Sequence, residues 1–250
     1  MQRAEMHAII LAAGVGSRLD LPESQPKALL EIGGQSLMAR QLENLSQLNV
    51  RRVTVCVGHQ ADHLTTEIQR TGHPEVQCVI NTQYHLGSVR SLWAVRAALT
   101  SGADILVLDA DVLYCPSLLA RLVNSPIQNC LLLDRDYPPG DEPVKICVRQ
   151  NAIVEFRKRP DPAIAFDFAG ESVGFFKFAP AAAAALARLT ERYIDTGRSN
   201  EPHEEAIRDL LLTENHAPGF EDITGTPWIE IDFPADLRRA REEILPRISP

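Results

Sequence analysis

Residue types suited to binding phosphate gather near the N-terminus. An apolar run over 8–12 opens into a loop that contains Gly14 and Gly16. Because glycine lacks a side chain, backbone N–H groups in such a loop can approach an anion closely. Arg18 and Lys27 add two positive charges, which suit the neutralisation of a polyphosphate chain. The segment therefore predicts a phosphate-binding loop at the end of a strand.

Two well-known phosphate-binding motifs do not fit this loop. The nucleotide-hydrolase loop has Gly-Lys-Ser/Thr five residues after its first glycine, whereas Lys27 stands thirteen residues after Gly14. The dinucleotide fingerprint requires a third glycine where this chain has Leu19. Glycines that only shape a turn would not need Arg18 and Lys27 beside them, so we favour phosphate binding.

Acidic residues follow two other apolar runs. Asp109 and Asp111 close the run over 105–108, and they point to the same side if the strand continues through them. Asp232 ends the apolar run over 228–232. Carboxylates at strand ends can hold a hard cation through oxygen ligands, and they can also cap helices. For Asp232 the second interpretation is the N-cap of a helix that begins at Pro234.

These motifs together resemble the signature of nucleotidyltransferases, which join a nucleoside monophosphate to a phosphorylated small molecule. The resemblance is greatest to the phosphocholine and phosphonate cytidylyltransferase branch and covers nearly the whole chain. It rests on the opening loop with Pro26-Lys27-Ala28-Leu29-Leu30-Glu31-Ile32-Gly33-Gly34, and then on Asn81-Thr82-Gln83-Tyr84, Ser91-Leu92-Trp93, Asp109-Ala110-Asp111, Gly170-Glu171-Ser172-Val173-Gly174 and Trp228-Ile229-Glu230-Ile231-Asp232.

The resemblance implies a role for each matching residue. Asp111 and Asp232 jointly bind Mg²⁺, while Lys27 and Arg18 are the catalytic cations that face the triphosphate. Lys158 and Glu171 contact the acceptor, and each is equally compatible with a solvated charge. The nucleotide-binding set implied is Leu11, Ala12, Ala13, Gly14, Gly16, Ser17, Arg18, Lys27, Asn81, Gly87, Ser88 and Asp109.

Strand-like and helical patterns alternate along the first half of the chain. Strands are expected over 53–57, 76–80 and 105–108, with helices after Ser36 and over 61–70 and 88–100. This alternation predicts a three-layer α/β/α Rossmann-like fold, GT-A-like, with a mainly parallel sheet and ligands at the carboxyl ends of its strands. A hairpin over 144–157 and a strand over 172–178 predict a small antiparallel acceptor-side region. Helices are further expected over 117–123, 180–194 and 202–213, and strands over 130–133 and 220–223.

We expect a single nucleotidyltransferase domain over 1–250. Its parts are a nucleotide-binding half over 1–135, an acceptor-binding half over 136–232 and a C-terminal helix over 233–250.

Of 250 residues, 33 are acidic and 25 are Lys or Arg, a net charge of −8 that argues against nucleic-acid and anionic-membrane partners. Five scattered cysteines without a C-x-x-C pair indicate buried thiols. No apolar run is long enough to span a membrane, so we expect a cytoplasmic protein; a homodimer is compatible with the sequence.

The leading hypothesis is a Mg²⁺-dependent nucleotidyltransferase that uses CTP and a phosphorylated or phosphonylated acceptor. The nucleobase stays open, because the branch commonly has two consecutive asparagines near the positions where this chain has Gly87 and Ser88. One alternative is a sugar-1-phosphate nucleotidyltransferase using UTP or dTTP. A nucleotide-sugar-dependent glycosyltransferase would not account for Arg18 and Lys27. A zinc helix at His203 fails because position 207 of an H-E-x-x-H motif is Ile207.

Overall fold

A mixed sheet of nine strands forms the centre of the computed structural model, which describes residues 5–19, 25–73, 75–213 and 216–248. Its main path runs β10-β9-β11-β6-β1-β4-β5, and β8 joins β11 to β12. The strands are β1 (Met6–Ala12), β4 (Arg52–Val57), β5 (Val76–Ile80), β6 (Asp104–Asp109), β8 (Cys130–Asp134), β9 (Lys145–Arg149), β10 (Ala152–Arg157), β11 (Phe168–Phe178) and β12 (Gly219–Asp222).

The parallel half of the sheet brings the opening loop beside the first acidic pair. β1 lies between β4 and β6 and is parallel to both, with Leu11 paired to Asp109. The core of β1 is inaccessible to solvent on both faces, as a parallel strand covered by helices requires. The loops that follow β1 and β6 therefore leave the sheet at the same edge, where this fold class binds its ligands.

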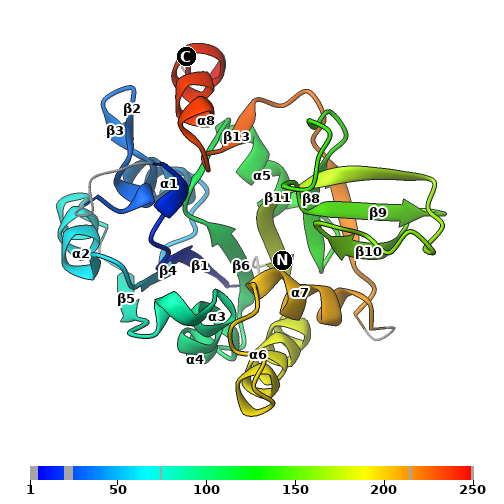
Figure 1. Ribbon diagram of the computed structural model, residues 1–250. Helices are drawn as coiled ribbons and strands as arrows, with labels where there is room; N and C mark the ends of the chain where they lie inside the picture. The colour runs from blue at the N-terminus through cyan, green and yellow to red at the C-terminus, as the bar shows by residue number, and fades with distance from the viewer. Residues whose placement is uncertain (1–4, 20–24, 74, 214–215, 249–250) are drawn as a thin grey trace.

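The antiparallel half extends the same sheet. β11 pairs antiparallel with β6, β8 and β9, and β9 continues into β10 through a two-residue turn. Gln150 and Asn151 occupy that turn with φ of 50° and 64°, the left-handed geometry that a tight hairpin turn requires. The predicted hairpin is therefore confirmed, and it extends the sheet on the side away from β5 (Figure 1).

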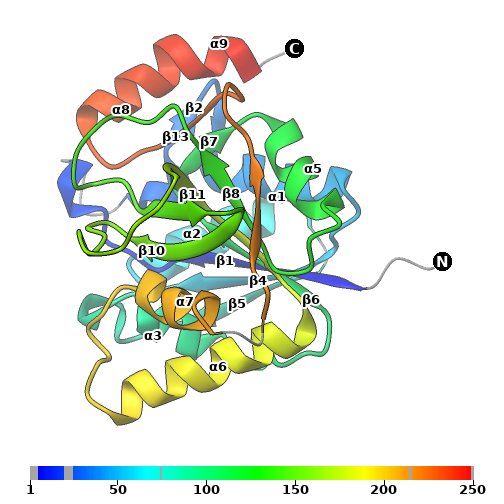
Figure 2. The same cartoon turned by 90° about the vertical axis from the view of Figure 1, so that its right-hand side faces the viewer.

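Helices cover both faces of the sheet, which completes the three layers (Figures 1 and 2). Ser36 begins the first helix, because its hydroxyl accepts a hydrogen bond from the Ala39 N–H at 3.1 Å. One buried cluster contains side chains of α1 (Leu37–Gln47), α2 (Ala61–Arg70) and α5 (Pro116–Asn124). The opposite cluster contains those of α3 (Val89–Ala94), α4 (Arg96–Leu99), α6 (Pro180–Asp195) and α7 (His203–Leu211).

A third apolar cluster ties the C-terminal segment to the beginning of the chain. Ala240 and Ile244 pack with Leu19, Leu30 and Ile229. The elements involved are the hairpin β2 (Glu31–Ile32) and β3 (Gln35–Ser36), the paired strands β7 (Val112–Tyr114) and β13 (Trp228–Glu230), and α8 (Pro234–Arg239), which continues through a π-helical turn over 240–244 into α9 (Leu245–Ile248). Figure 2 shows this helical segment on the opposite side of the sheet from α6.

Two local expectations were wrong, although the predicted fold class is confirmed. The helix expected over 88–100 is divided at Val95, whose φ of −93° and ψ of 15° leave helical geometry. β6 ends at Asp109, so Asp111 lies in a turn before β7 and does not share a strand face with Asp109. Expectations that extend over 1–4 and 249–250 lie outside the described residues. Within the described ranges, no helix is both long and apolar enough to cross a membrane.

Candidate active site

A cleft of about 390 Å³ opens at the carboxyl edge of β1 and β6. Most of the residues implied for the nucleotide line it, and the distant Lys158 and Asp232 line it as well. The predicted residues in this lining are Leu11, Ala12, Ala13, Gly14, Gly16, Ser17, Arg18, Lys27, Ser88, Asp109, Asp111, Lys158 and Asp232. The fold thus gathers into one cleft residues that are spread over more than two hundred positions of sequence.

Lys27 lies at the centre of this cleft, between two carboxylates. Its ammonium donates hydrogen bonds to Asp111 Oδ2 at 2.8 Å and to Asp232 Oδ1 at 2.5 Å. Burial opposes its charge, yet the two carboxylates outweigh burial and raise the pKa of Lys27 above its usual value. Arg18 reaches the other oxygen of Asp232, with Nη2 2.8 Å from Oδ2. Lys27 is therefore held as a permanent cation.

The opening loop approaches Lys27 closely because of Gly16. A Cβ on Gly16 would lie 2.7 Å from Lys27 Cγ, and the backbone there has a φ of 67°. Both the contact and the left-handed backbone favour glycine. Nothing lies within 4 Å of a Cβ built on Gly14, so that glycine leaves open space beside the loop. Gly16 therefore allows the loop to pack against Lys27, and Gly14 leaves room for a ligand beside the loop backbone.

Three carboxylates are close enough to share a cation. Ligand oxygens of Asp111, Glu230 and Asp232 lie within 4.8 Å of one another. Asp232 is not the cap of α8, because Asp236 accepts the hydrogen bonds of the Asp232 and Phe233 N–H groups at 3.1 and 2.8 Å. Its carboxylate is turned into the cleft, so the capping interpretation was wrong.

Glu230 was not among the predicted site residues. The sequence held one signal for it, since alternation along 228–232 places Glu230 on the face of Asp232. Glu230 is exposed to solvent, yet dense protein on its other side and the carboxylates of Asp111 and Asp232 raise its pKa above the usual range. Burial on that side is the larger cause of this shift, and the neighbouring carboxylates add to it.

The charged side chains that line the cleft suit a divalent cation. The lining carries five carboxylates, on Asp109, Asp111, Glu204, Glu230 and Asp232, and three cations, on Arg18, Lys27 and Lys158, a formal excess of two negative charges. Oxygen ligands with this excess match the preferences of a hard divalent cation. The residues present therefore fit such an ion.

Asp109 occupies the floor of the cleft against a glycine. A Cβ on Gly174 would lie 2.2 Å from Asp109 Oδ2, and Gly174 has a φ of 78°. Burial and the neighbouring Asp111 carboxylate raise the pKa of Asp109 well above its usual range. On its other side, Asp109 Oδ1 lies 3.4 Å from Nε2 of His203. His203 and Glu204 also line the cleft and were not predicted.

Asn81 and Gly87, which were expected to contact the nucleotide, do not line the cleft. The Asn81 amide donates to Ser91 Oγ at 3.2 Å, and its carbonyl accepts from the Gln83 N–H at 2.9 Å. Gly87 is pressed against Asn200, whose carbonyl carbon would lie 2.6 Å from an added Cβ. Both residues shape the loop that carries Ser88, and their contact with a nucleotide stays a prediction.

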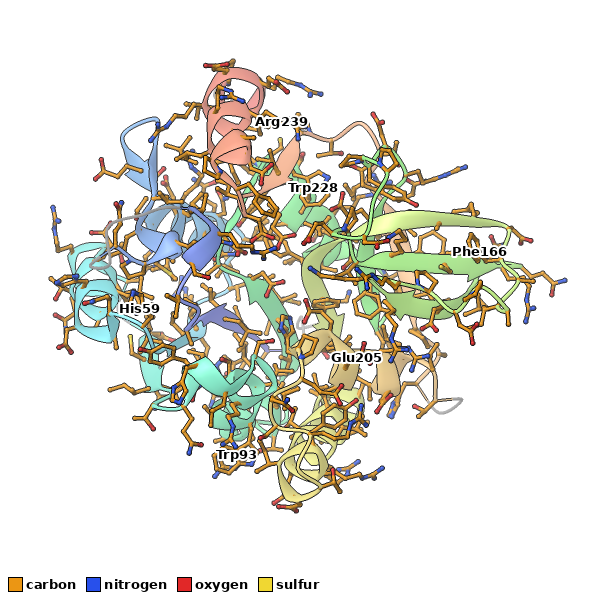
Figure 3. The ribbon with its side chains drawn as sticks, viewed as in Figure 1. His59, Trp93, Phe166, Glu205, Trp228 and Arg239 are labelled. Carbon is orange, nitrogen blue, oxygen red and sulfur yellow. The ribbon has the colours of Figure 1, made fainter. Side chains whose placement is uncertain are left out.

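Glu171 lies in a second pocket of about 300 Å³ that adjoins the first through Glu230 and Asp232. Arg239, on α8, and Trp228, below that helix in Figure 3, line this second pocket. The Trp228 indole donates to Asp134 Oδ2 at 2.7 Å, which fixes the ring. Glu171 pairs with Asp134 across β11 and β8, and burial together with this carboxylate raises the pKa of Glu171 to about 7.

Lys158 and Arg18 of the opening loop share one carboxylate partner, Glu142. The Lys158 ammonium lies 3.4 Å from Glu142 Oε2, and Arg18 Nη1 donates to the same oxygen at 3.1 Å. All three side chains are substantially exposed, so these ion pairs contribute little to stability. Arg18 and Lys158 can therefore exchange Glu142 for another anion at small cost.

Comparisons with known proteins agree with this architecture. The chain is 28% identical to CMP-5'-(3-aminopropyl)phosphonate synthase of Streptomyces rubellomurinus over 94% of its own length, although it spans only 38% of that relative. It is 24% identical to CTP:phosphoglutamine cytidylyltransferase of Campylobacter jejuni, over 93% of this chain and 98% of the relative.

Two solved structures share the fold. The CTP:phosphocholine cytidylyltransferase of Streptococcus pneumoniae superposes with a TM-score of 0.74 at 21% identity, covering 95% of this chain and 98% of the other. The inositol-1-phosphate CTP transferase of T. maritima superposes with a TM-score of 0.75 at 20% identity, covering 98% and 99%. Residues 8–197 match the family described as the MobA-like NTP transferase domain, and the chain belongs to this family.

Proposed function

We propose that this chain transfers CMP from CTP to a small phosphorylated or phosphonylated acceptor, releases pyrophosphate and requires Mg²⁺. The observation that carries the proposal is Lys27, which joins Asp111 and Asp232 in a cleft that Arg18 also lines. A triphosphate and a divalent cation need opposite charges within one site, and this cleft offers both. The aminopropylphosphonate and phosphoglutamine relatives favour CTP and the class of acceptor.

In this reaction an oxygen of the acceptor phosphate forms a bond to the α-phosphorus of CTP. The bond from that phosphorus to the oxygen bridging to the β-phosphorus breaks, and pyrophosphate leaves with the electron pair. A phosphate monoester has a second pKa of about 6, so the acceptor oxygen is largely ionised at neutral pH. No general base is needed, and catalysis can rest on positioning and on neutralising charge.

The residues of the cleft would divide this work. Lys27 neutralises charge on the oxygens of the α-phosphoryl group, and Arg18 with the N–H groups of the opening loop holds the β- and γ-phosphates. Asp111 and Asp232, with Glu230 beside them, would hold the Mg²⁺ ion. When bound, this ion supplies charge neutralisation to the phosphates. The pairing of Arg18 with Glu142 is exposed, so a phosphate can replace Glu142, while the contact with Asp232 keeps the guanidinium beside the proposed metal ligands.

The acceptor would extend from Lys158 into the second pocket. Lys158 lines the first cleft and would bind the phosphate or phosphonate group. The second pocket combines several carboxylates, among them Asp134 and Glu171, with the rings of Trp228 and Phe233. Carboxylates and aromatic faces favour a cation, so we propose an acceptor whose far end carries an ammonium group.

The proposed single domain thus divides into a nucleotide-binding half over 1–135 and an acceptor-binding half over 136–232, followed by the C-terminal helix. We also propose a cytoplasmic location, where CTP is available.

One assay tests the proposal. Purified protein is mixed with magnesium chloride, each ribonucleoside triphosphate or dTTP, and a panel of acceptors, and pyrophosphate release is followed. The panel contains phosphocholine, aminoethylphosphonate, phosphorylated amino acids and hexose 1-phosphates. We expect pyrophosphate with CTP and an amino-bearing acceptor. Turnover with UTP or dTTP and a hexose 1-phosphate would establish the sugar-nucleotide alternative, and release of a nucleoside diphosphate from a nucleotide-sugar would establish a glycosyltransferase.

A further inference from the structure

His203 presents a buried ring nitrogen to the cleft. This nitrogen has no part in the reaction as described so far. The His203 side chain is 7% exposed and lines the cleft. Among the described residues, its Nε2 atom has no hydrogen-bond partner. An unsatisfied polar atom in such a place costs free energy unless something else satisfies it. A ligand in the cleft is therefore a natural partner.

Ser88 fixes the orientation of this imidazole. The Ser88 hydroxyl oxygen accepts the backbone N–H of His203 at 2.8 Å and lies 3.1 Å from His203 Nδ1. Having accepted one hydrogen bond, the hydroxyl can donate its own hydrogen to Nδ1. Glu204 Oε2 lies 3.2 Å from Nδ1 as well, so the ring proton stands on Nε2 when Ser88 donates to Nδ1, and on Nδ1 when Nδ1 donates to Glu204. In both tautomers Nε2 faces Asp109, as a donor in the first and as an acceptor in the second, and a hydroxyl group can pair with either.

The surrounding framework holds His203 rigidly. The Val89 N–H donates to the Glu201 carbonyl at 3.2 Å, which ties the start of α3 to the segment before α7. Farther along α7, Arg208 donates to both oxygens of the buried Glu155 on β10, at 2.5 and 2.8 Å. These hydrogen bonds tie α7, and with it His203, to α3 and β10.

One hydroxyl group can reach both His203 and Asp109. Their Nε2 and Oδ1 atoms are 3.4 Å apart, too far for a good direct hydrogen bond. An oxygen about 2.8 Å from each atom can accept from Nε2–H and donate its own hydrogen to the carboxylate. Asp109 Oδ2 faces Gly174, so Oδ1 is the oxygen turned to this partner. A neutral hydroxyl satisfies both groups at once.

We propose that His203 and Asp109 bind a ribose hydroxyl of the nucleotide, and that Ser88 positions the imidazole for this contact. The inference rests on the proposed function, because it assumes that a nucleoside triphosphate occupies the cleft. His203 contacts Ser88, which follows the loop after β5, and Asp109 lies two residues before Asp111 of the cation-binding cluster. The sugar is the part of the nucleotide that lies between its base and its phosphates. His203 is thus a specificity-determining residue for ribonucleotides.

The test compares binding of CTP, 2′-deoxy-CTP and 3′-deoxy-CTP in magnesium chloride without acceptor, by calorimetry. Wild-type protein is expected to bind CTP about tenfold more tightly than at least one deoxy analogue, the effect of a single hydrogen-bonded hydroxyl. His203→Ala is expected to weaken CTP binding by about the same factor while leaving that analogue unchanged. His203→Gln retains an N–H donor and should recover part of the preference.

Matched controls separate this role from a structural one. His63 is exposed on α2, so His63→Ala should preserve both affinity and preference. Ser88→Ala should reduce the preference without abolishing CTP binding. The melting temperature of each variant reports whether it is folded. An equal loss of affinity for all three nucleotides in folded His203→Ala, or no preference in wild type, overturns the inference; the first outcome would fit a contact to the base, the phosphates or the acceptor.

The inference and the proposed function can fail separately. Pyrophosphate release with CTP but without discrimination between the sugars removes the inference and keeps the function. Discrimination between the sugars without pyrophosphate release with any acceptor keeps the inference and removes the proposed function. If the panel assay selects UTP, the uridine series replaces the cytidine series. If no nucleoside triphosphate binds, both are wrong.

Discussion

Replacing Lys27 by methionine would separate the structural from the chemical use of its charge. Methionine keeps an unbranched apolar side chain and removes the ammonium. In the folded protein that ammonium contacts Asp111 Oδ2 at 2.8 Å and Asp232 Oδ1 at 2.5 Å. The substitution leaves both carboxylates beside Glu230 with Arg18 as the remaining partner.

The geometry sets the size of the expected effect. Removing one partner of a fully buried ion pair costs about 3–5 kcal/mol, because the remaining charge stays buried. Here the side chains of Lys27, Asp111 and Asp232 are 13%, 22% and 14% exposed, so water relieves part of this cost. We expect a loss of about 2 kcal/mol, which lowers the melting temperature of a chain of this size by about 4–8 °C.

Magnesium should reverse the loss of stability without restoring activity. The uncompensated carboxylates of Lys27→Met can bind the cation without competition from an ammonium, so added magnesium chloride should raise its melting temperature more than that of wild type. Turnover should still fall by about a hundred- to a thousandfold, the usual effect of removing one group that stabilises transition-state charge. Thermal melts and pyrophosphate release measure the two quantities on the same samples.

Lys177→Met supplies the matched control. Lys177 is 6% exposed, and its ammonium donates to the Ser125 carbonyl at 2.5 Å. Its replacement should destabilise the protein by an amount that magnesium does not change, and activity should persist. Turnover within tenfold of wild type in Lys27→Met would refute the assigned role. An equal magnesium response in both variants would refute the shared cation site.

Three further predictions address other parts of the molecule. Burial and a facing carboxylate raise the pKa of Glu171 to about 7, above its unfolded value. The contribution of Glu171 to stability is therefore full at acid pH and is lost as pH rises through about 7. Glu171→Gln should flatten the decline of the melting temperature between acid and mildly alkaline pH, and an unchanged profile would contradict this. Arg208→Met leaves the fully buried Glu155 unpaired and should cost about 3 kcal/mol in chemical denaturation, most of which Glu155→Gln in the same chain should restore. Gly174→Ala should lower turnover at least tenfold with the fold retained, because the added Cβ would meet Asp109 Oδ2 at 2.2 Å; normal turnover would show that the carboxylate can move aside.

The sequence predicted the layers of the fold because their signals are local. Apolar runs of strand length alternate with helical periodicity, and ligands of such folds bind where strands end. The opening loop, Lys27 and Asp111 could therefore be placed at one edge in advance. The involvement of Asp232 depended on the resemblance to nucleotidyltransferases, since no local pattern links it to Lys27.

The misses have physical causes that a linear pattern does not contain. Glu230 lies on β13, which pairs with β7 outside the main sheet, and only that pairing brings it to Asp111. His203 enters the cleft because α7 abuts the start of α3, a contact between segments far apart in sequence. Nor did the sequence indicate that the Asn81 amide holds the loop in which it lies, a use that leaves its predicted contact with the nucleotide untested.

The sequence separation between Lys27 and Asp232, 205 positions, has a consequence during synthesis. Most of the sheet can assemble while the ribosome is still translating the later strands. The carboxylate that completes the cluster, and the apolar segment that packs it against the beginning of the chain, emerge among the last residues described. A nascent chain stalled before β13 would carry Lys27 and Asp111 without Glu230 and Asp232, so the proposed cation site would be incomplete. Catalytic competence is therefore coupled to nearly complete translation of this domain.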